Sequence, residues 1–233
     1  SYTVGNSVSG SVTNVAVEAY VFTVGSGGSQ LYFDVLSNSP YVSWTLTGET
    51  GTVVAPRNFS STDSDGSPNP PVRTLTPGMY RFAVSTGQAD SQSYTFRLMD
   101  LATATALTPG IVVNGTLNPA NETDLYRFTA QAGERYFFDH QSLSGGSPYW
   151  RLIAPSGSQV FGPFGFSDVD VLTLPLTGTY TLLVEGRYFE TTPISYSFVM
   201  QPVTDDVAAL PLNQTVTGAI GTAGQQDRYI FTL

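Results

Sequence analysis

Short runs in which large apolar residues alternate with polar or smaller ones recur along the chain. Three of them are YRFTA at 126–130, YTLLV at 180–184 and SYSFVM at 195–200. A period of two is that of a half-buried β-strand, and the Tyr, Phe, Val and Thr in these runs favour strands. Clusters of Gly, Pro, Asn and Ser separate them, and no segment has the period of an amphipathic helix. The pattern predicts an all-β fold of short antiparallel strands, with a tight hairpin turn at Asn114-Gly115.

The same strand patterns occur more than once. The motif Tyr-x-Phe-Thr appears three times, at Tyr20, Phe22 and Thr23, at Tyr126, Phe128 and Thr129, and at Tyr229, Phe231 and Thr232. Residues 30–34, 75–84 and 93–98 likewise match 135–139, 174–184 and 195–200. A repeat of about a hundred residues holding several short strands is typical of a β-sandwich.

The repeat predicts how the chain is divided. We expect two tandem antiparallel, jelly-roll-like β-sandwich domains, at 1–102 and 107–203, and a partial third repeat at 204–233 made of a linker and two strands. The Tyr and Phe of the repeated motif should be largely buried, and Gly78 and Gly178 should lie in turns before Tyr80 and Tyr180.

The second copy resembles a known family. Residues 113–139 (VNGTLNPANETDLYRFTAQAGERYFFD), then LIAPSG at 152–157 and LTGTYTLLVEG at 176–186, are similar to the bacterial pre-peptidase C-terminal (PPC) domain. The first copy fits the pattern less well, since Glu18 is followed by Ala19 and its middle loop is longer. The resemblance implies a secreted jelly-roll-like sandwich, often in tandem and attached to proteases or large surface proteins. Some members of that family bind calcium, and others bind collagen or other polymers.

Composition narrows the functional class. The net charge is −9, only 12% of the residues are charged, and both Lys and Cys are absent. No basic surface is available to bind nucleic acid. No apolar run approaches the roughly 20 residues of a membrane-spanning helix. A polar surface built from Ser, Thr, Asn, Gln and Gly is typical of secreted β proteins, so we expect an extracellular or cell-surface protein.

The sequence carries little catalytic chemistry. His140 is the single histidine, and its equivalent is missing from the first copy. The chain has no Gly-x-Ser-x-Gly, His-Glu-x-x-His or phosphate-binding Gly-rich motif. We therefore expect a protein that is not an enzyme.

Two acidic loops form a candidate calcium site, and no other cofactor is indicated. Calcium prefers several oxygen ligands, which alternate in the segment STDSDGSPNP and recur at the corresponding place in the second copy. The candidate ligands are Asp63, Asp65, Asn69, Asp168 and Asp170. The alternative is an ordinary turn, in which such side chains bond to their own backbone.

Aromatic residues form a candidate contact surface. Gly and Pro interrupt the segment FGPFGF, so we expect Phe161, Phe164 and Phe166 to lie on a loop that contacts sugars or a partner protein. Burial in the sandwich core is the alternative. Tyr229 and Phe231 of the partial third repeat are further candidates for partner contacts.

Two strands alone are marginally stable in water, so the partial third repeat needs a partner. It could belong to a longer array, fold back on its own chain, or pair with another copy of the chain by strand donation. The sequence thus favours an extracellular structural protein that spaces or assembles into a surface fibre or stalk, through head-to-tail self-association or contact with other surface proteins. The alternative function is a polysaccharide- or protein-binding module appended to a secreted hydrolase.

Overall fold

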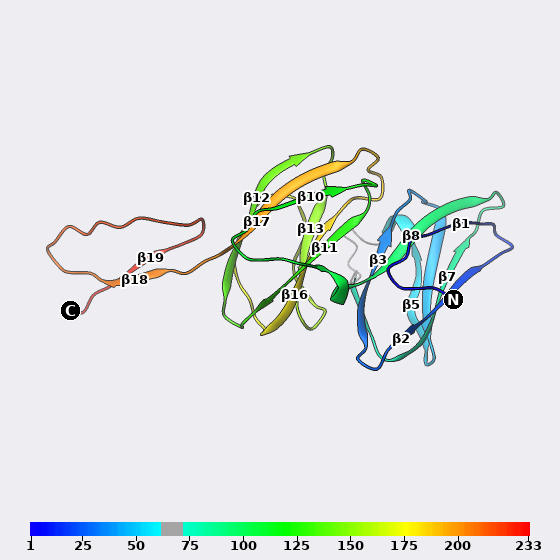
Figure 1. The fold of residues 1–233 in the computed structure, drawn as a ribbon, viewed down its shortest axis with the longest axis horizontal. Helices are drawn as coiled ribbons and strands as arrows, with labels where there is room; N and C mark the ends of the chain where they lie inside the picture. The colour runs from blue at the N-terminus through cyan, green and yellow to red at the C-terminus, as the bar shows by residue number, and fades with distance from the viewer. Residues whose placement is uncertain (62–71) are drawn as a thin grey trace.

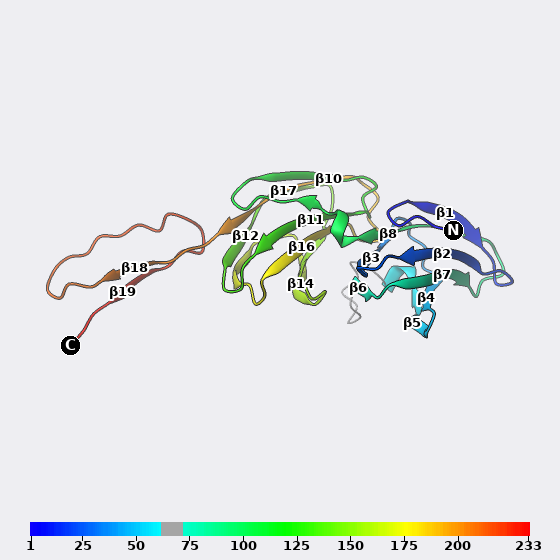
Figure 2. The ribbon, with the colours of Figure 1, turned by 60° about the horizontal axis from the view of Figure 1, so that its bottom comes forward.

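A computed structural model describes residues 1–61 and 72–233 of the chain, and its long axis runs through two β-sandwiches and a thin C-terminal lobe (Figure 1). A second view keeps the three parts in the same row (Figure 2). The all-β prediction is confirmed. Within the described residues no helix has the length and apolar character that a membrane span requires.

The first sandwich consists of two four-stranded sheets that face each other. One sheet has the order β1 (Val8–Val12), β8 (Gln92–Asp100), β3 (Ser29–Val35), β6 (Val72–Leu75). The other has the order β2 (Glu18–Val24), β7 (Gly78–Thr86), β4 (Val42–Gly48), β5 (Gly51–Asn58). Two such sheets, in the orders 1-8-3-6 and 2-7-4-5, are the arrangement of a jelly roll. The 3-10 helices η1 (Phe59–Ser61) and η2 (Leu101–Thr103) follow β5 and β8.

The second sandwich repeats this arrangement and adds one strand. Its first sheet has the order β10 (Val113–Leu117), β17 (Ile194–Pro202), β12 (Arg135–Ser144), β15 (Val169–Thr173). Its second sheet has the order β14 (Gln159–Gly165), β13 (Tyr149–Ile153), β16 (Gly178–Glu185), β11 (Thr123–Ala130), β9 (Thr105–Ala106). The linker strand β9 lies between the two predicted domain ranges and pairs parallel with β11.

The C-terminal lobe resembles the first part of the second sandwich but is shorter. It holds β18 (Asp206–Ala209) and β19 (Asp227–Ile230), which also pair in parallel. In the described part of the chain, these two strands pair only with each other. The lobe therefore reproduces the β9–β11 contact of the second sandwich without the strand that corresponds to β16.

The repeated tyrosines explain part of the sequence motif. In each sandwich the Tyr of Tyr-x-Phe reaches a Tyr of the last strand: Tyr20 Oη lies 2.6 Å from Tyr94 Oη, and Tyr126 Oη lies 2.7 Å from Tyr196 Oη. Asp124 accepts a 2.6 Å hydrogen bond from Tyr196. In the second sandwich, the acidic residue two positions before the motif tyrosine thus accepts a hydrogen bond from this pair of hydroxyl groups.

The late Gly-x-Tyr motif has a structural role as well. Tyr80 and Tyr180 each donate a hydrogen bond back to a carbonyl four residues earlier, at Thr76 (2.9 Å) and Leu176 (2.7 Å). The glycine two residues before each tyrosine has a positive φ, 154° at Gly78 and 146° at Gly178, and begins its strand. Each motif therefore fixes the start of the central strand of its sheet.

Burial of the Tyr-x-Phe residues follows the prediction in the sandwiches and departs from it in the lobe. Phe22, Tyr126 and Phe128 are buried, and Tyr20 is partly buried. Tyr229 and Phe231 are 36% and 53% exposed. The expectation of burial is wrong for these two, because the lobe lacks the facing sheet that covers their equivalents.

The hairpin expected at Asn114-Gly115 is also wrong, because both residues lie within strand β10. A Cβ on Gly115 would lie 2.2 Å from the Tyr196 ring, and Gly10 faces Tyr94 in the same way. The glycine is needed here because a tyrosine ring lies flat against the strand.

We predict that Gly115→Ala destabilises the protein by about 1–3 kcal/mol, because the new methyl group overlaps a buried ring in a close-packed core. Gly165→Ala is the matched control, since nothing lies within 4 Å of a Cβ there. Urea unfolding of both variants measures the effect. Equal stabilities would contradict the role assigned to Gly115.

Candidate functional site: the joint between the sandwiches

The two sandwiches meet through a buried apolar cluster. Strand β3 has both faces covered, since Leu31, Phe33 and Val35 point into the first core while Tyr32 and Asp34 point to the second sandwich. Around Tyr32 the cluster contains Val72, Leu101, Ala104, Leu125, Ile153 and Leu183. Tyr188, from the loop after β16, packs against the first core. The two sandwiches are thus joined by a buried apolar contact and not only by a flexible linker.

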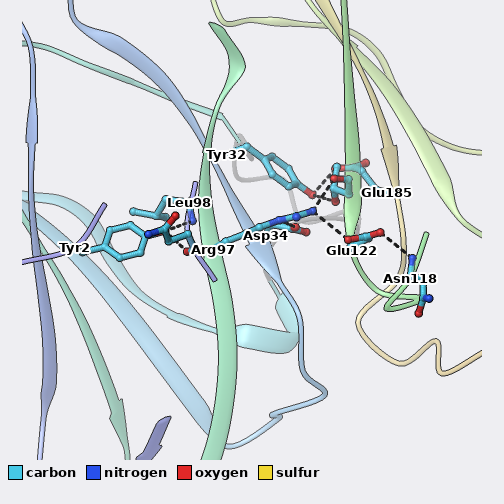
Figure 3. Close-up of polar contacts among 10 residues, drawn as sticks. Tyr2, Tyr32, Asp34, Arg97, Leu98, Asn118, Glu122 and Glu185 are labelled. Atoms are coloured by element: carbon cyan, nitrogen blue, oxygen red, sulfur yellow. Dashed lines mark hydrogen bonds and ion pairs between the residues drawn. The ribbon is translucent and has the colours of Figure 1, made fainter. Parts of the chain in front are cut away.

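A buried polar group crosses the joint. The Tyr32 hydroxyl, on a side chain with no exposed surface, donates a 2.8 Å hydrogen bond to Glu185 Oε1 and lies 3.2 Å from Thr123 Oγ1. The other oxygen of Glu185 accepts a 2.7 Å bond from Arg151 Nε, and both side chains are almost completely buried. A tyrosine of the first sandwich therefore donates to the carboxylate of an ion pair in the second sandwich. Figure 3 shows Tyr32 reaching Glu185.

A second ion pair lies beside the first. Arg97, on β8, donates through Nε to Asp34 Oδ2 at 2.6 Å and through a terminal nitrogen to the Thr123 carbonyl at 3.0 Å. The same guanidinium lies 3.5 Å from Glu122 of the second sandwich. Glu122 in turn accepts from the backbone N–H of Asn118 at 2.7 Å. Figure 3 shows Arg97 reaching from Asp34 toward Glu122.

Burial changes the pKa values in this cluster. It raises the pKa of the Asp34 carboxyl to about 7, and the attraction of Arg97 offsets only part of that rise. Burial also raises the pKa of Glu122. For Arg97 burial alone would lower the pKa, but Asp34, Glu122 and Asp124 outweigh it and leave the pKa raised. The guanidinium therefore stays charged and holds acidic groups of both sandwiches.

The joint residues depart from the internal repeat. By strand register, Arg151 and Glu185 correspond to Thr45 and Ser85 of the first sandwich. Tyr32 and Arg97 correspond to Phe137 and Val199 of the second. Arg151, Glu185 and Arg97 thus have uncharged counterparts in the other copy, and Tyr32 has a counterpart without a hydroxyl group. These joint residues were not predicted from the sequence, in which the available signal is an arginine in a strand whose other copy has a neutral residue.

The proposed calcium ligands give no assembled site in the described structure. Asp63, Asp65 and Asn69 lie outside the described residues. Asp168 accepts a hydrogen bond from the backbone N–H of His140, and Asp170 accepts one from that of Val171. Within residues 1–61 and 72–233 no three His, Cys, Asp or Glu side chains gather as metal ligands would.

The aromatic segment 161–166 is mostly strand, not loop. It lies largely in β14, and Phe161 and Phe166 are buried against Trp150. These two cannot form a contact surface, because both side chains are buried in the core. Phe164 is 49% exposed and stacks on Phe161 at 5.9 Å. It remains a candidate contact residue.

A different aromatic group lies nearby. The Arg187 guanidinium stacks between two rings, 4.6 Å from the centre of Tyr149 and 4.5 Å from that of Phe189. Phe189 is 40% exposed. Such a stack holds flat surfaces in a fixed position at the protein surface.

The contact between the second sandwich and the lobe contains fewer charged side chains than the joint between the sandwiches. Asp205 pairs with Arg135 at 2.6 Å and with Arg228 at 2.9 Å. The hydrogen bond from Arg135, which outweighs the opposing effect of desolvation, holds the pKa of Asp205 below its usual value. A hollow of about 770 Å³ lies here, lined in part by Tyr136, Val203 and Gln226.

Fold and joint define a tandem jelly-roll protein. No protein-family model matches the sequence, and no curated protein sequence matches it. Among solved structures, the periplasmic lysozyme inhibitor PliG of Aeromonas hydrophila, which inhibits g-type lysozyme, is 18% identical, with 42% of this chain and 96% of that chain covered and a TM-score of 0.34.

Two longer structures are also similar. The CUB1-EGF-CUB2 domain of human MASP-1/3 is 10% identical over 83% of this chain and 99% of that chain, with a TM-score of 0.27. The same domains of rat MASP-1 are 12% identical over 82% and 96%, with a TM-score of 0.26. At these scores the similarities carry no conclusion about what the chain binds.

We predict that the Arg151–Glu185 pair is coupled. Arg151→Met leaves Glu185 as a buried charge with Tyr32 as its remaining described donor, and should cost about 3–5 kcal/mol. Adding Glu185→Leu should restore part of that stability, because two apolar side chains need no partner. Thr45→Val, at the equivalent position of the first sandwich, should change stability by no more than about 0.5 kcal/mol. A double-mutant cycle in urea measures this, and additive effects would refute the coupling.

Proposed function

We propose that the chain is a non-catalytic extracellular structural module that holds its sandwiches at a fixed spacing, as part of a surface fibre or stalk. The observation that carries this proposal is the joint, where Tyr32, Glu185 and Arg151 share a buried network. A flexible linker would leave both faces in water, where such groups need no partners. Buried charges tolerate few alternative geometries, so they favour a single orientation of the two sandwiches.

The resemblance to PPC domains supports the extracellular part of this proposal. Members of that family are secreted, and they often occur in tandem. The low content of charged residues and the absence of Lys and Cys are in line with it. A spacer also needs no conserved pocket or metal, only a defined length between its ends.

The spacer proposal predicts a narrow distance distribution between the sandwiches. Because the chain has no Cys, Asp90→Cys and Thr129→Cys introduce unique sites on exposed positions of the two sandwiches. Double electron–electron resonance between spin labels at these sites should give one narrow peak. Leu125→Asp, which places a charge in the joint, should broaden it. A broad distribution in the protein with an intact joint would refute the fixed spacing.

A second candidate function is binding of an extracellular polymer, favoured by the Tyr149–Arg187–Phe189 stack. Sugar rings and proline-rich chains both pack on such flat surfaces. Sedimentation with insoluble cellulose, chitin and collagen tests it. We expect any binding to fall at least tenfold in Phe189→Ala and to persist in Met79→Ala, which removes an exposed side chain of the first sandwich. Absence of binding to all three polymers would count against this candidate.

A further inference from the structure

The lobe exposes side chains whose equivalents form a core elsewhere in the chain. Leu212, Ile220 and Phe231 are 53%, 59% and 53% exposed, and Leu233 is fully exposed. Their equivalents in the first sandwich are Val4, Val12, Phe22 and Val24, which pack in or against its core.

The match extends over the whole segment Leu210–Leu233, which corresponds to Tyr2–Val24. At every core-facing position the two segments carry apolar or aromatic residues of similar kind, or the same glycine. The pairs are Tyr2 and Leu210, Val4 and Leu212, Val8 and Val216, Gly10 and Gly218, Val12 and Ile220, Tyr20 and Tyr229, Phe22 and Phe231, and Val24 and Leu233.

The backbone agrees with this correspondence. Gly5, Gly110 and Asn213 occupy equivalent positions, and all have a left-handed φ, of 95°, 79° and 62°. The first residue of each segment also donates a hydrogen bond from its backbone N–H to a carbonyl of the strand that carries the Tyr-x-Phe motif. These bonds run from Tyr2 to Val21 (2.6 Å), from Leu107 to Arg127 (2.8 Å) and from Leu210 to Ile230 (2.8 Å). The lobe therefore already has much of the conformation of a first segment.

The first sandwich is built so that this segment can be replaced. Among the described strands, β1 and β2 are the edge strands of its two sheets, pairing with β8 and β7 respectively. Removing Tyr2–Val24 therefore separates no other pair of strands. It leaves two open edges and an apolar surface of the shape that Tyr2–Val24 fills.

The geometry points to strand exchange between copies of this chain. We propose that Leu210–Leu233 of one copy replaces Tyr2–Val24 in the first sandwich of a second copy, joining copies head to tail. The contact of β18 with β19 then repeats that of β9 with β11, so each new joint resembles the one within the chain. This inference rests on the proposed spacer and names its partner as the same protein.

The facing surfaces support this choice of partner. Phe137 and Val199, at the end of the second sandwich, lack the hydroxyl and guanidinium of Tyr32 and Arg97. The first sandwich, which would face them, has Ser85 and Thr45 in place of Glu185 and Arg151, so the buried ion pair has no counterpart at the new joint, and Asp139, the equivalent of Asp34, is the acidic residue that remains beside Val199. Gln30, which donates to the Pro155 carbonyl across the existing joint, corresponds to Arg135, and Pro155 corresponds to Glu49. An oppositely charged pair would thus meet at the new joint.

Tyr2–Val24 has the advantage of being attached to its own sandwich, so it competes at a high effective concentration. Exchange should therefore be promoted by unfolding and refolding at high protein concentration, as in domain swapping.

Disulfide trapping tests the exchange in this chain, which has no Cys of its own. Thr23 lies opposite Met79, and Ser9 lies opposite Thr95. Their counterparts in the lobe are Thr232 and Thr217. Directly opposed positions satisfy the Cα separation that a disulfide needs. The matched variants are therefore Thr232→Cys with Met79→Cys, and Thr217→Cys with Thr95→Cys.

After refolding at high concentration and oxidation, both matched variants should give a ladder of linked oligomers on a non-reducing gel. The mismatched variant, Thr217→Cys with Met79→Cys, should remain largely monomeric, because these positions belong to different sheets. No ladder in the matched variants, a matched disulfide confined to monomers, or an equal ladder in the mismatched variant would each overturn the exchange.

A glycine variant gives an independent test. A Cβ on Gly10 would lie 2.6 Å from the Tyr94 hydroxyl, and a Cβ on Gly218 would lie 2.5 Å from the Tyr229 hydroxyl within the lobe. Gly218→Val should therefore abolish the ladder when combined with the matched cysteines. Ala219→Val changes the next residue, which points away from the core, and this variant should still form the ladder. A ladder that survives Gly218→Val would contradict the proposed register.

The experiments distinguish a failure of the fixed spacing from a failure of the strand exchange. A narrow spin-label distance distribution without any ladder would overturn the strand exchange and leave the spacer intact. A ladder formed by chains with a broad distribution would overturn the fixed spacing instead.

Discussion

The arrangement of the two sandwiches depends on one buried contact, the Tyr32 hydroxyl on the Arg151–Glu185 ion pair. Burying charges costs several kcal/mol per ion unless each is paired and hydrogen-bonded. Glu185 meets that condition only with partners from both sandwiches. Separating the sandwiches would expose these groups along with the apolar cluster around them. The network therefore adds little net stability by itself, but it selects one orientation among the many that an apolar contact alone would allow.

This constraint explains where the internal repeat is kept and where it is lost. Core positions such as Phe22 and Phe128 keep the same residue, because both sandwiches have the same interior. Joint positions differ, because each face meets a different neighbour. Arg97 lies where Asp34 and Glu122 converge, whereas its counterpart Val199 lies opposite Asp139 and cannot form an ion pair with it. The positions at which the two copies differ thus indicate which face of each sandwich contacts the other sandwich.

The sequence was sufficient for the fold and insufficient for the joint, for related reasons. Alternation and repetition report local periodicity, and they predicted strands, sandwiches and the buried Tyr-x-Phe motif of the full copies. They do not report which outward-facing residues of a strand are covered by another domain, so Tyr32 and Asp34 were not distinguishable from surface residues. The expectation for Phe161 and Phe166 failed because Gly162 and Pro163 were taken to end a strand that in fact continues through them. The Arg187 stack was missed since its residues come from separate loops and strands.

The same reasoning shows why the lobe carries more information than its size implies. A surface segment under no constraint would lose its apolar alternation, because exposed apolar residues favour aggregation. Residues Leu210–Leu233 keep the apolar, tyrosine or glycine character of every core-facing position of Tyr2–Val24, including Gly218, where a Cβ would lie 2.5 Å from the Tyr229 hydroxyl. A segment with this pattern is adapted to a sheet that it does not itself contain, and the first sandwich is a described part of this molecule that has the corresponding edges.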